Sequence, residues 1–189
     1  PETMDHIRAT GARIWFTTDG HMCIDTPYCA IERLLPYYGF RWGAEAYEFW
    51  SVAWLTRDPY RYGWHAYIHQ TDQPGKSYWI RYPNGDGYLL YPGAPRGLDG
   101  PVSSIRLEQA REGVEDYEYL YRLRTLADRA RASGRDTTAA DRALDAAARL
   151  APIPNAGGRY ATKMLPDPDA VGRVRDAVAQ AIEALQAAR

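Results

Sequence analysis

The sequence predicts an α/β fold in which strands and helices alternate and a tail of helices follows. Three observations lead to this prediction. Two aromatic and β-branched runs flank a helical stretch within residues 12–55, a turn-forming segment joins two further apolar runs within residues 77–91, and helical spacing dominates after residue 103. With 189 residues, the chain is long enough to bury the core of one domain.

The first elements are expected to be the end of a helix, closed by Gly11, and a strand over residues 12–18. This run, ARIWFTT, is apolar and precedes the turn residues Asp19-Gly20, as is typical of a buried strand. A helix is expected to start near Pro27 and to kink or end at Pro36, because proline lacks a backbone N–H. The aromatic run AYEFWSVAWL over residues 46–55 then predicts the second strand.

The middle of the chain is expected to hold a long loop and a hairpin. Residues 56–76 are interrupted by Pro and Gly and show no regular period, which predicts the loop. Residues 77–82 and 87–91 predict two paired strands, joined by the turn Pro83-Asn84-Gly85-Asp86. Residues 92–100 are expected to connect this hairpin to the next helix.

A long helix is predicted from Ser103 or Ser104, either of which can cap it, to about Ser133-Gly134. Apolar residues at spacings of three and four predict one buried stripe along it. They are Leu107, Ala110, Val114, Tyr117 and Tyr121.

Two further helices are expected over residues 138–150 and 169–188. The first carries Leu144, Ala147 and Ala151 on one face, and the second starts after Asp167 as the cap and Pro168 at its first position. The last helix has a regular apolar face made of Val171, Val174, Val178, Ile182 and Leu185.

The charge of the chain argues against two classes of partner. With 23 Lys+Arg and 24 Asp+Glu, the net charge of −1 favours neither nucleic acid nor an anionic membrane surface. No stretch reaches the roughly 20 apolar residues of a membrane span, and the first residues lack an apolar signal-peptide core. A neutral or small polar ligand is the better expectation.

The aromatic residues are six Trp and fifteen Tyr against three Phe, and most of them lie before Pro92. Trp and Tyr combine an apolar body with a polar edge, so they suit a wet binding surface better than a dry core. Cys23 and Cys29 can conceivably form a disulfide, although two unpaired thiols are favoured. Because His21 is the one further ligand nearby, a metal site is disfavoured, and no cofactor is expected.

Five segments of the chain occur in an order that is typical of one enzyme family. They are RIWFTT, AIERLLPYYGFRWGAEA, EFWSVAWL, GDGYLLYPG and SSIRLEQAREGVEDYEYL. Over residues 11–126 the chain resembles the C-terminal portion of the catalytic domain of glycoside hydrolase family 123 and of proteins with the related domain of unknown function 4091. The last two segments are the most specific, since their order and spacing match as well as their letters.

The resemblance implies the C-terminal portion of a (β/α)₈ TIM-type barrel followed by a helical tail. Residues 1–133 would then supply the last barrel strands, the hairpin and the closing helix, and residues 134–189 would form helices that pack on them. A complete barrel of this kind needs about 250 residues. A companion segment or chain on the N-terminal side is therefore expected to complete it.

The activity implied by the resemblance is that of a β-N-acetylgalactosaminidase with a substrate-assisted, retaining mechanism. In that family the N-acetyl group of the sugar attacks, an Asp orients it, and an adjacent Glu is the general acid. This chain contains no Asp-Glu dipeptide, so the catalytic pair is expected on the companion, and this chain is expected to supply walls of the substrate site. Family resemblance also favours an extracellular or periplasmic location.

Candidate substrate-binding residues follow the second predicted strand and the hairpin turn. Trp50 and Trp54 share one face of the strand, so one of them is expected to stack on a sugar, unless both fill the barrel interior. Tyr60, Trp64 and Tyr67 are candidates for the outer wall, with a self-packed loop cluster as the alternative. Asp86 can bind a sugar hydroxyl, although a turn Asp more often bonds its own backbone.

The histidines and the charged residues of the long helix are given structural interpretations. His65 and His69 are expected to face solvent. Glu108 with Arg111, and Glu112 with Asp116, have the spacing of neighbours on a helix surface, so Arg106 and these residues are interpreted as structural.

The sequence leaves two other functions open. One is a non-catalytic carbohydrate-binding or scaffold module that keeps the aromatic wall without the acid pair. The other is a glycosidase with a different carboxylate pair, which requires two of four residues to face each other across the cleft. These four are Asp19, Asp25, Asp58 and Asp86.

Overall fold

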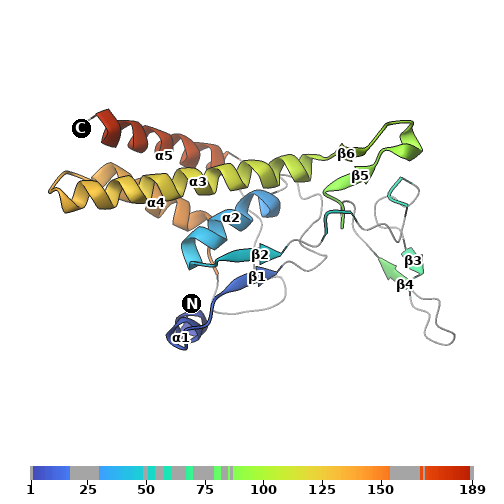
Figure 1. Ribbon diagram of the computed structural model, residues 1–189, viewed down its shortest axis with the longest axis horizontal. Helices are drawn as coiled ribbons and strands as arrows, with labels where there is room; N and C mark the ends of the chain where they lie inside the picture. The colour runs from blue at the N-terminus through green and yellow to red at the C-terminus, as the bar shows by residue number, and fades with distance from the viewer. Residues whose placement is uncertain are drawn as a thin grey trace. The chain divides into compact units, whose positions relative to one another are not determined.

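A computed structural model describes residues 2–17, 30–48, 51–53, 58–60, 67–69, 79–81, 85, 87–153, 167 and 169–187 (Figure 1). Helices and short strands are mixed along the chain, so the fold class is α/β, as predicted. The elements in order are α1 Glu2–Ala9, β1 Trp15–Thr17, α2 Ala30–Trp42, β2 Ala46–Glu48, β3 Tyr67–His69, β4 Trp79–Arg81, β5 Leu90–Pro92, the 3₁₀ turn η2 Ala94–Arg96, β6 Pro101–Ser103, α3 Ile105–Ala132, α4 Thr138–Leu150 and α5 Ala170–Ala187.

The chain divides into two compact units. The first contains Pro1–Phe16, Arg33–Tyr47 and Ala110–Arg189, and the second contains Thr17–Glu32 and Glu48–Gln109. No helix in the described part of the chain has the length and apolar character needed to cross a membrane.

The first unit is mainly helical (Figure 1), and α4 packs against α5. Short side chains on α4 let the two helices approach closely. The apolar face predicted for α5 is confirmed, since all five of its residues are buried. The buried residues of this pair are Ala140, Ala143, Ala147 and Leu150 on α4, and Val171, Val174, Val178, Ala181, Ile182 and Leu185 on α5.

The remaining helices of this unit complete the core. α2 buries Leu34, Leu35, Tyr37 and Phe40. A kink or an end was expected at Pro36, and α2 does not end there but runs on to Trp42. At the C-terminal end of α2, Arg41 and Trp42 donate hydrogen bonds of 3.0 Å to the carbonyl of Ala151, which follows α4.

The second unit contains two small antiparallel sheets. β3 pairs with β4, with Ile68 opposite Ile80, and β5 pairs with β6, with Tyr91 opposite Val102. Strand β5 also follows an isolated antiparallel bridge between Ala53 and Tyr88. These sheets are short, so the turns and the side chains around them carry much of the local order.

The loop between β5 and β6 depends on one glycine. A Cβ atom at Gly93 would lie 2.1 Å from the carbonyl oxygen of Gly100. Real Cβ atoms essentially never approach so closely, so the loop can close only with glycine here.

The predicted pairing of the strands is wrong. β4 and β5 were expected to form one hairpin across residues 83–86, but β4 pairs with β3 and β5 pairs with β6. Residues 56–76 therefore contain a strand, and residues 93–100 form the hairpin loop. Alternating apolar residues indicate that a strand exists, but they do not specify its partner.

The described strands form three separate two-stranded sheets, in which β1 pairs with β2. β1 and β2 are shorter than the predicted strands over residues 12–18 and 46–55. The barrel therefore stays a prediction, as do the domain boundaries.

The bounds predicted for α3 are nearly correct, but its predicted buried stripe is wrong. Val114 is 48% exposed and Tyr121 is 58% exposed. The buried face instead lies on a neighbouring row of residues, which a search for apolar letters misses because it contains two charged residues and a glycine. This row consists of Arg106, Gly113, Asp116, Leu120, Leu123, Ala127 and Ala130.

Candidate functional site

The second unit holds a cluster of tyrosines and arginines around Tyr60. The Tyr60 hydroxyl donates a 2.9 Å hydrogen bond to the carbonyl of Pro92, and its backbone N–H donates to Asp58 at 2.8 Å. The Tyr60 ring lies 5.8 Å from the ring of Tyr91, between centroids. The guanidinium carbon of Arg96 lies 4.3 Å from the centre of the Tyr60 ring.

Arg106 supports this cluster from the buried side of β5. It is 3% exposed, and its Nε atom donates to the carbonyl of Tyr88 at 2.6 Å. Its Nη2 atom donates to the hydroxyl of Tyr91, also at 2.6 Å. The rings of Tyr88 and Tyr91 stack at 5.4 Å with an interplanar angle of 20°, so Tyr91 is held by both its ring and its hydroxyl.

The start of α3 is bonded to the residue just before β5. Ser104 donates a 2.7 Å hydrogen bond to the carbonyl of Leu89, and its oxygen lies 3.4 Å from the N–H of Leu107 as a capping contact. Ser104 is thus the cap, one of the two predicted positions. Ser51 donates to the carbonyl of Gly87 at 3.0 Å, which fixes the other end of this segment.

The arrangement offers a ligand both apolar and polar contacts. Aromatic rings present apolar planes, the Tyr91 hydroxyl presents a polar group, and Arg96 presents an exposed cation. A search of the described residues finds no group of three or more His, Cys, Asp or Glu side chains that could hold a metal ion.

Of the predicted site residues, only Tyr60 and Tyr67, which begins β3, lie within the described part of the chain. Trp50, Trp54, Trp64 and Asp86 lie outside it. The same holds for Cys23, Cys29, His21 and His65, and for Asp19 and Asp25 of the alternative carboxylate pair.

Sequence reasoning missed Tyr91, Arg96 and Arg106 as members of this cluster. Arg106 lies two turns before Gly113 on the buried face of α3, and this spacing is a signal that it points inward. No comparable signal marks Arg96, since only the folded loop brings it over Tyr60.

A second charged cluster joins three helices of the first unit. Arg33 on α2 contacts Asp116 on α3 at 2.7 Å, and Arg175 on α5 contacts Glu112 at 2.5 Å and Glu115 at 3.3 Å. Asp116 has only 1% of its side chain exposed, so it is not the surface neighbour that its spacing suggested. Its structural interpretation fits these contacts.

Electrostatics in this cluster follow from burial and pairing. Burial, followed by the nearby Asp116 carboxylate, raises the pKa of the Tyr37 hydroxyl well above its ordinary value. The hydrogen bond from Arg175 lowers the pKa of Glu112. At neutral pH the Tyr37 hydroxyl therefore stays protonated and Glu112 stays ionised, which favours a fixed network over proton transfer.

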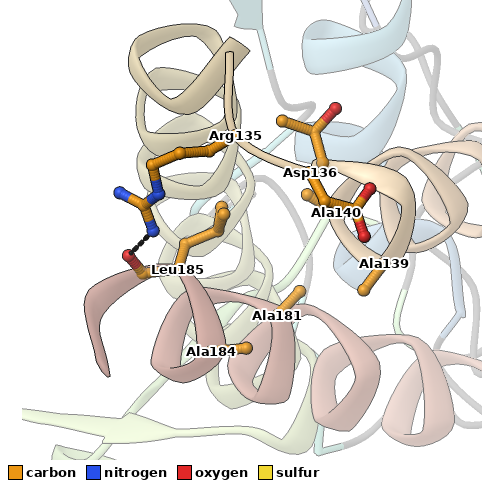
Figure 2. A pocket seen from close by; sticks show the side chains of 8 residues that line it. Arg135, Asp136, Ala139, Ala140, Ala181, Ala184 and Leu185 are labelled. Atoms are coloured by element: carbon orange, nitrogen blue, oxygen red, sulfur yellow. Dashed lines mark hydrogen bonds between the residues drawn. The ribbon is translucent and has the colours of Figure 1, made fainter. Parts of the chain in front are cut away.

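The first unit also has a shallow cavity of about 460 Å³ between the start of α4 and the end of α5 (Figure 2). Figure 2 shows alanine side chains along its wall and Arg135 turned to the carbonyl of Leu185, to which it donates at 2.8 Å. Because this hydrogen bond occupies Arg135, the cavity offers a ligand mainly methyl groups and the carboxylate of Asp136.

The sequence of this region matches the model of an enzyme family. The model of the glycoside hydrolase 123 catalytic domain matches residues 31–123. This part of the chain belongs to the glycoside hydrolase 123 family. The match covers the whole Tyr60 cluster and most of the contacts between α2 and α3, so the family assigned by resemblance is confirmed.

The glycoside hydrolase 123 assignment is carried by the family model alone. A comparison with curated proteins finds no match to this chain. The chain is thus a glycoside hydrolase module whose sugar and linkage remain to be proposed.

Proposed function

We propose that the chain is part of a glycoside hydrolase that removes N-acetylhexosamine residues, N-acetylgalactosamine in particular, by a substrate-assisted retaining mechanism. The observation that carries this proposal is the match of residues 31–123 to the glycoside hydrolase 123 catalytic domain. A match to a catalytic domain supports a hydrolase over the alternative of a non-catalytic binding or scaffold module.

In this mechanism the substrate provides its own nucleophile. The carbonyl oxygen of the 2-acetamido group attacks C1 while the bond from C1 to the glycosidic oxygen breaks, and a Glu donates its proton to the leaving oxygen. Water then opens the cyclic intermediate at C1, so the product keeps the starting configuration. An Asp orients the acetamido group and stabilises its developing positive charge.

The proposed role of this chain is to form walls of the substrate site. Tyr60 belongs to the described cluster, and Trp50, Trp54, Trp64 and Asp86 are proposed to contribute further stacking and hydrogen-bonding groups. No cofactor is required, because acid catalysis and the acetamido group supply the chemistry.

The catalytic Asp-Glu pair is proposed to lie on an N-terminal companion segment or chain. That companion would complete a TIM-type barrel, with residues 1–133 contributing its last part and residues 134–189 packing on it. The absence of an Asp-Glu dipeptide from the sequence motivates this proposal.

Hydrolysis by the intact protein tests the function. The intact protein, isolated with any companion, is expected to release 4-nitrophenol from the N-acetyl-β-galactosaminide, whereas this chain alone is not. The matching β-galactoside, which lacks the acetamido nucleophile, should be hydrolysed at least 100-fold more slowly, a barrier difference of about 2.7 kcal/mol. Equal hydrolysis of the two glycosides would reject the substrate-assisted mechanism.

A further inference from the structure

We infer that Tyr91 and Arg96, gathered on Tyr60, form a subsite for an acidic saccharide, with Arg106 as a positioning residue behind it. This inference rests on the proposed function and adds the class of substrate. The ligand it names is a sugar that carries a carboxylate or a sulfate group.

Arg96 is an exposed cation that its neighbours hold in place. It ends the turn η2, and Gly97 after it adopts a positive φ of 69° that closes the turn. Its guanidinium lies over the Tyr60 ring, and among the described residues no carboxylate forms an ion pair with it. Stacking on an aromatic ring orients a guanidinium while leaving its N–H edge able to bind a planar anion.

Within the described part of the chain, the Tyr91 hydroxyl has a hydrogen-bond partner on one side only. Its oxygen accepts a hydrogen bond from Arg106, so the hydroxyl proton is left to point to another acceptor. A saccharide hydroxyl or ring oxygen can be that acceptor, because Tyr91 is partly exposed. The hydrogen bond from the buried Arg106 thus leaves the Tyr91 hydroxyl as a donor toward a ligand.

Tyr60 brings the side chains of Tyr91 and Arg96 together. Tyr91 and Arg96 both contact the ring of Tyr60, and the Tyr60 hydroxyl is bonded to Pro92 between them in sequence. The loop is therefore organised before a ligand arrives, which lowers the entropy cost of binding. One saccharide unit with an anionic substituent can contact both groups.

Isothermal titration calorimetry on the full chain tests the subsite with three probes. They are N-acetylgalactosamine, N-acetylgalactosamine 6-sulfate, and the disaccharide of glucuronic acid with N-acetylgalactosamine. A charge-assisted hydrogen bond is worth about 1.5 kcal/mol or more, so at least one anionic probe is expected to bind roughly tenfold tighter than the neutral sugar. Whichever anionic probe gains more identifies sulfate or carboxylate as the preferred group.

Matched variants separate this role from general electrostatics. Arg96→Gln should remove the preference for the anionic probes over N-acetylgalactosamine. Arg149→Gln, which removes one exposed arginine from α4, should keep the preference. Tyr91→Phe should weaken all three probes by about 2- to 10-fold, as expected for one lost hydrogen bond.

Two results would overturn the inference. If N-acetylgalactosamine binds and neither anionic probe binds more tightly, the acidic subsite is rejected while the proposed function stands. If no probe binds, the subsite is rejected as well, and the hydrolysis assay on the intact protein decides the proposed function separately.

Discussion

Asp116 is the residue on which the charged cluster of the first unit depends. Its carboxylate is almost fully buried, with Arg33 at 2.7 Å and Arg175 at 3.5 Å. Such a pair adds little over a well-packed apolar core, but removing one partner leaves the others buried and uncompensated. The stabilising effect of the cluster is therefore best measured by removing this one charge.

Replacing Asp116 with Asn is expected to lower the free energy of unfolding by about 3 kcal/mol, because two arginines lose their shared carboxylate. Urea denaturation followed by circular dichroism measures this change. Asp128→Asn is the matched control, since Asp128 is 63% exposed and pairs with Arg131 on the surface. A change below about 0.5 kcal/mol is expected there, and equal effects in both variants would contradict the role of Asp116.

The ion pair between Glu112 and Arg175 predicts how the free energy of unfolding changes at low pH. Its hydrogen bond with Arg175 lowers its pKa in the folded state, so its stabilising contribution is complete above the unfolded value of about 4.3. It is lost as the pH falls through the folded pKa, because protonation then favours the unfolded chain.

Between pH 5 and pH 3, the free energy of unfolding should therefore fall less steeply for Glu112→Gln than for the unmodified chain. Denaturation curves across this interval test the slope. Glu118→Gln, an exposed glutamate on the same helix, serves as the control. If both variants follow the unmodified chain, the ion pair with Arg175 contributes no pH dependence.

At the scale of elements, the crossing of α2 and α3 is set by Gly113. A Cβ atom there would lie 2.6 Å from the carbonyl oxygen of Arg33 and 3.2 Å from Cγ of Pro36. The two helices therefore approach each other backbone to backbone at this point. This close approach also brings Arg33 within reach of Asp116.

Gly113→Ala is expected to destabilise the protein by about 1 to 3 kcal/mol, since overpacking exceeds the gain in helix propensity. Gly172→Ala on α5 is the opposite case, because nothing lies within 4 Å of its Cβ position. That variant should gain up to about 1 kcal/mol from propensity alone. Thermal denaturation compares the two, and stabilisation by both would show that the helices do not cross so closely.

The contrast between helices explains what the sequence could predict. α4 and α5 were located well because short and branched apolar residues repeat on one face of each. On α3 the length was predictable but the buried face was not, since Arg106 and Asp116 are buried through partners far away in the sequence. Strand pairing failed for the same reason, as the partners of β4 and β5 depend on the loops between strands.

The candidate site was predictable only in its composition. An excess of Tyr and Trp before Pro92 indicated an aromatic binding surface, and Tyr60 was identified from it. Arg96 could not be selected, because nothing in the sequence distinguishes an arginine over an aromatic ring from any other exposed arginine. The fold of the loop gives Arg96 its role.

At the scale of the whole molecule, the two units share one continuous helix. The boundary between them falls between Gln109 and Ala110, inside α3. The first turn of α3 carries Arg106, which is bonded to Tyr88 and Tyr91. Because helix formation is cooperative, loss of the first turns should loosen the Tyr60 cluster before it affects α4 and α5.

Gln109→Pro tests this order of loosening, because proline removes one helical hydrogen bond and costs roughly 3 kcal/mol within a helix. Hydrogen exchange is expected to speed up at the amides of Leu89 and Leu90, which bond to Val52, while α4 and α5 keep their protection. Gln109→Ala should leave both regions unchanged. Equal loss of protection in α4 and α5 would show that the units unfold together.

The close approach at Gly93 bears on how relatives of this chain should be compared. Because the carbonyl of Gly100 excludes any side chain there, every sequence that builds this loop must keep the glycine, whatever sugar it binds. A shared glycine at this position therefore reports common backbone geometry and carries no information about substrate. Divergence in specificity within the family should be sought at the positions of Tyr91 and Arg96, where the backbone imposes no such demand.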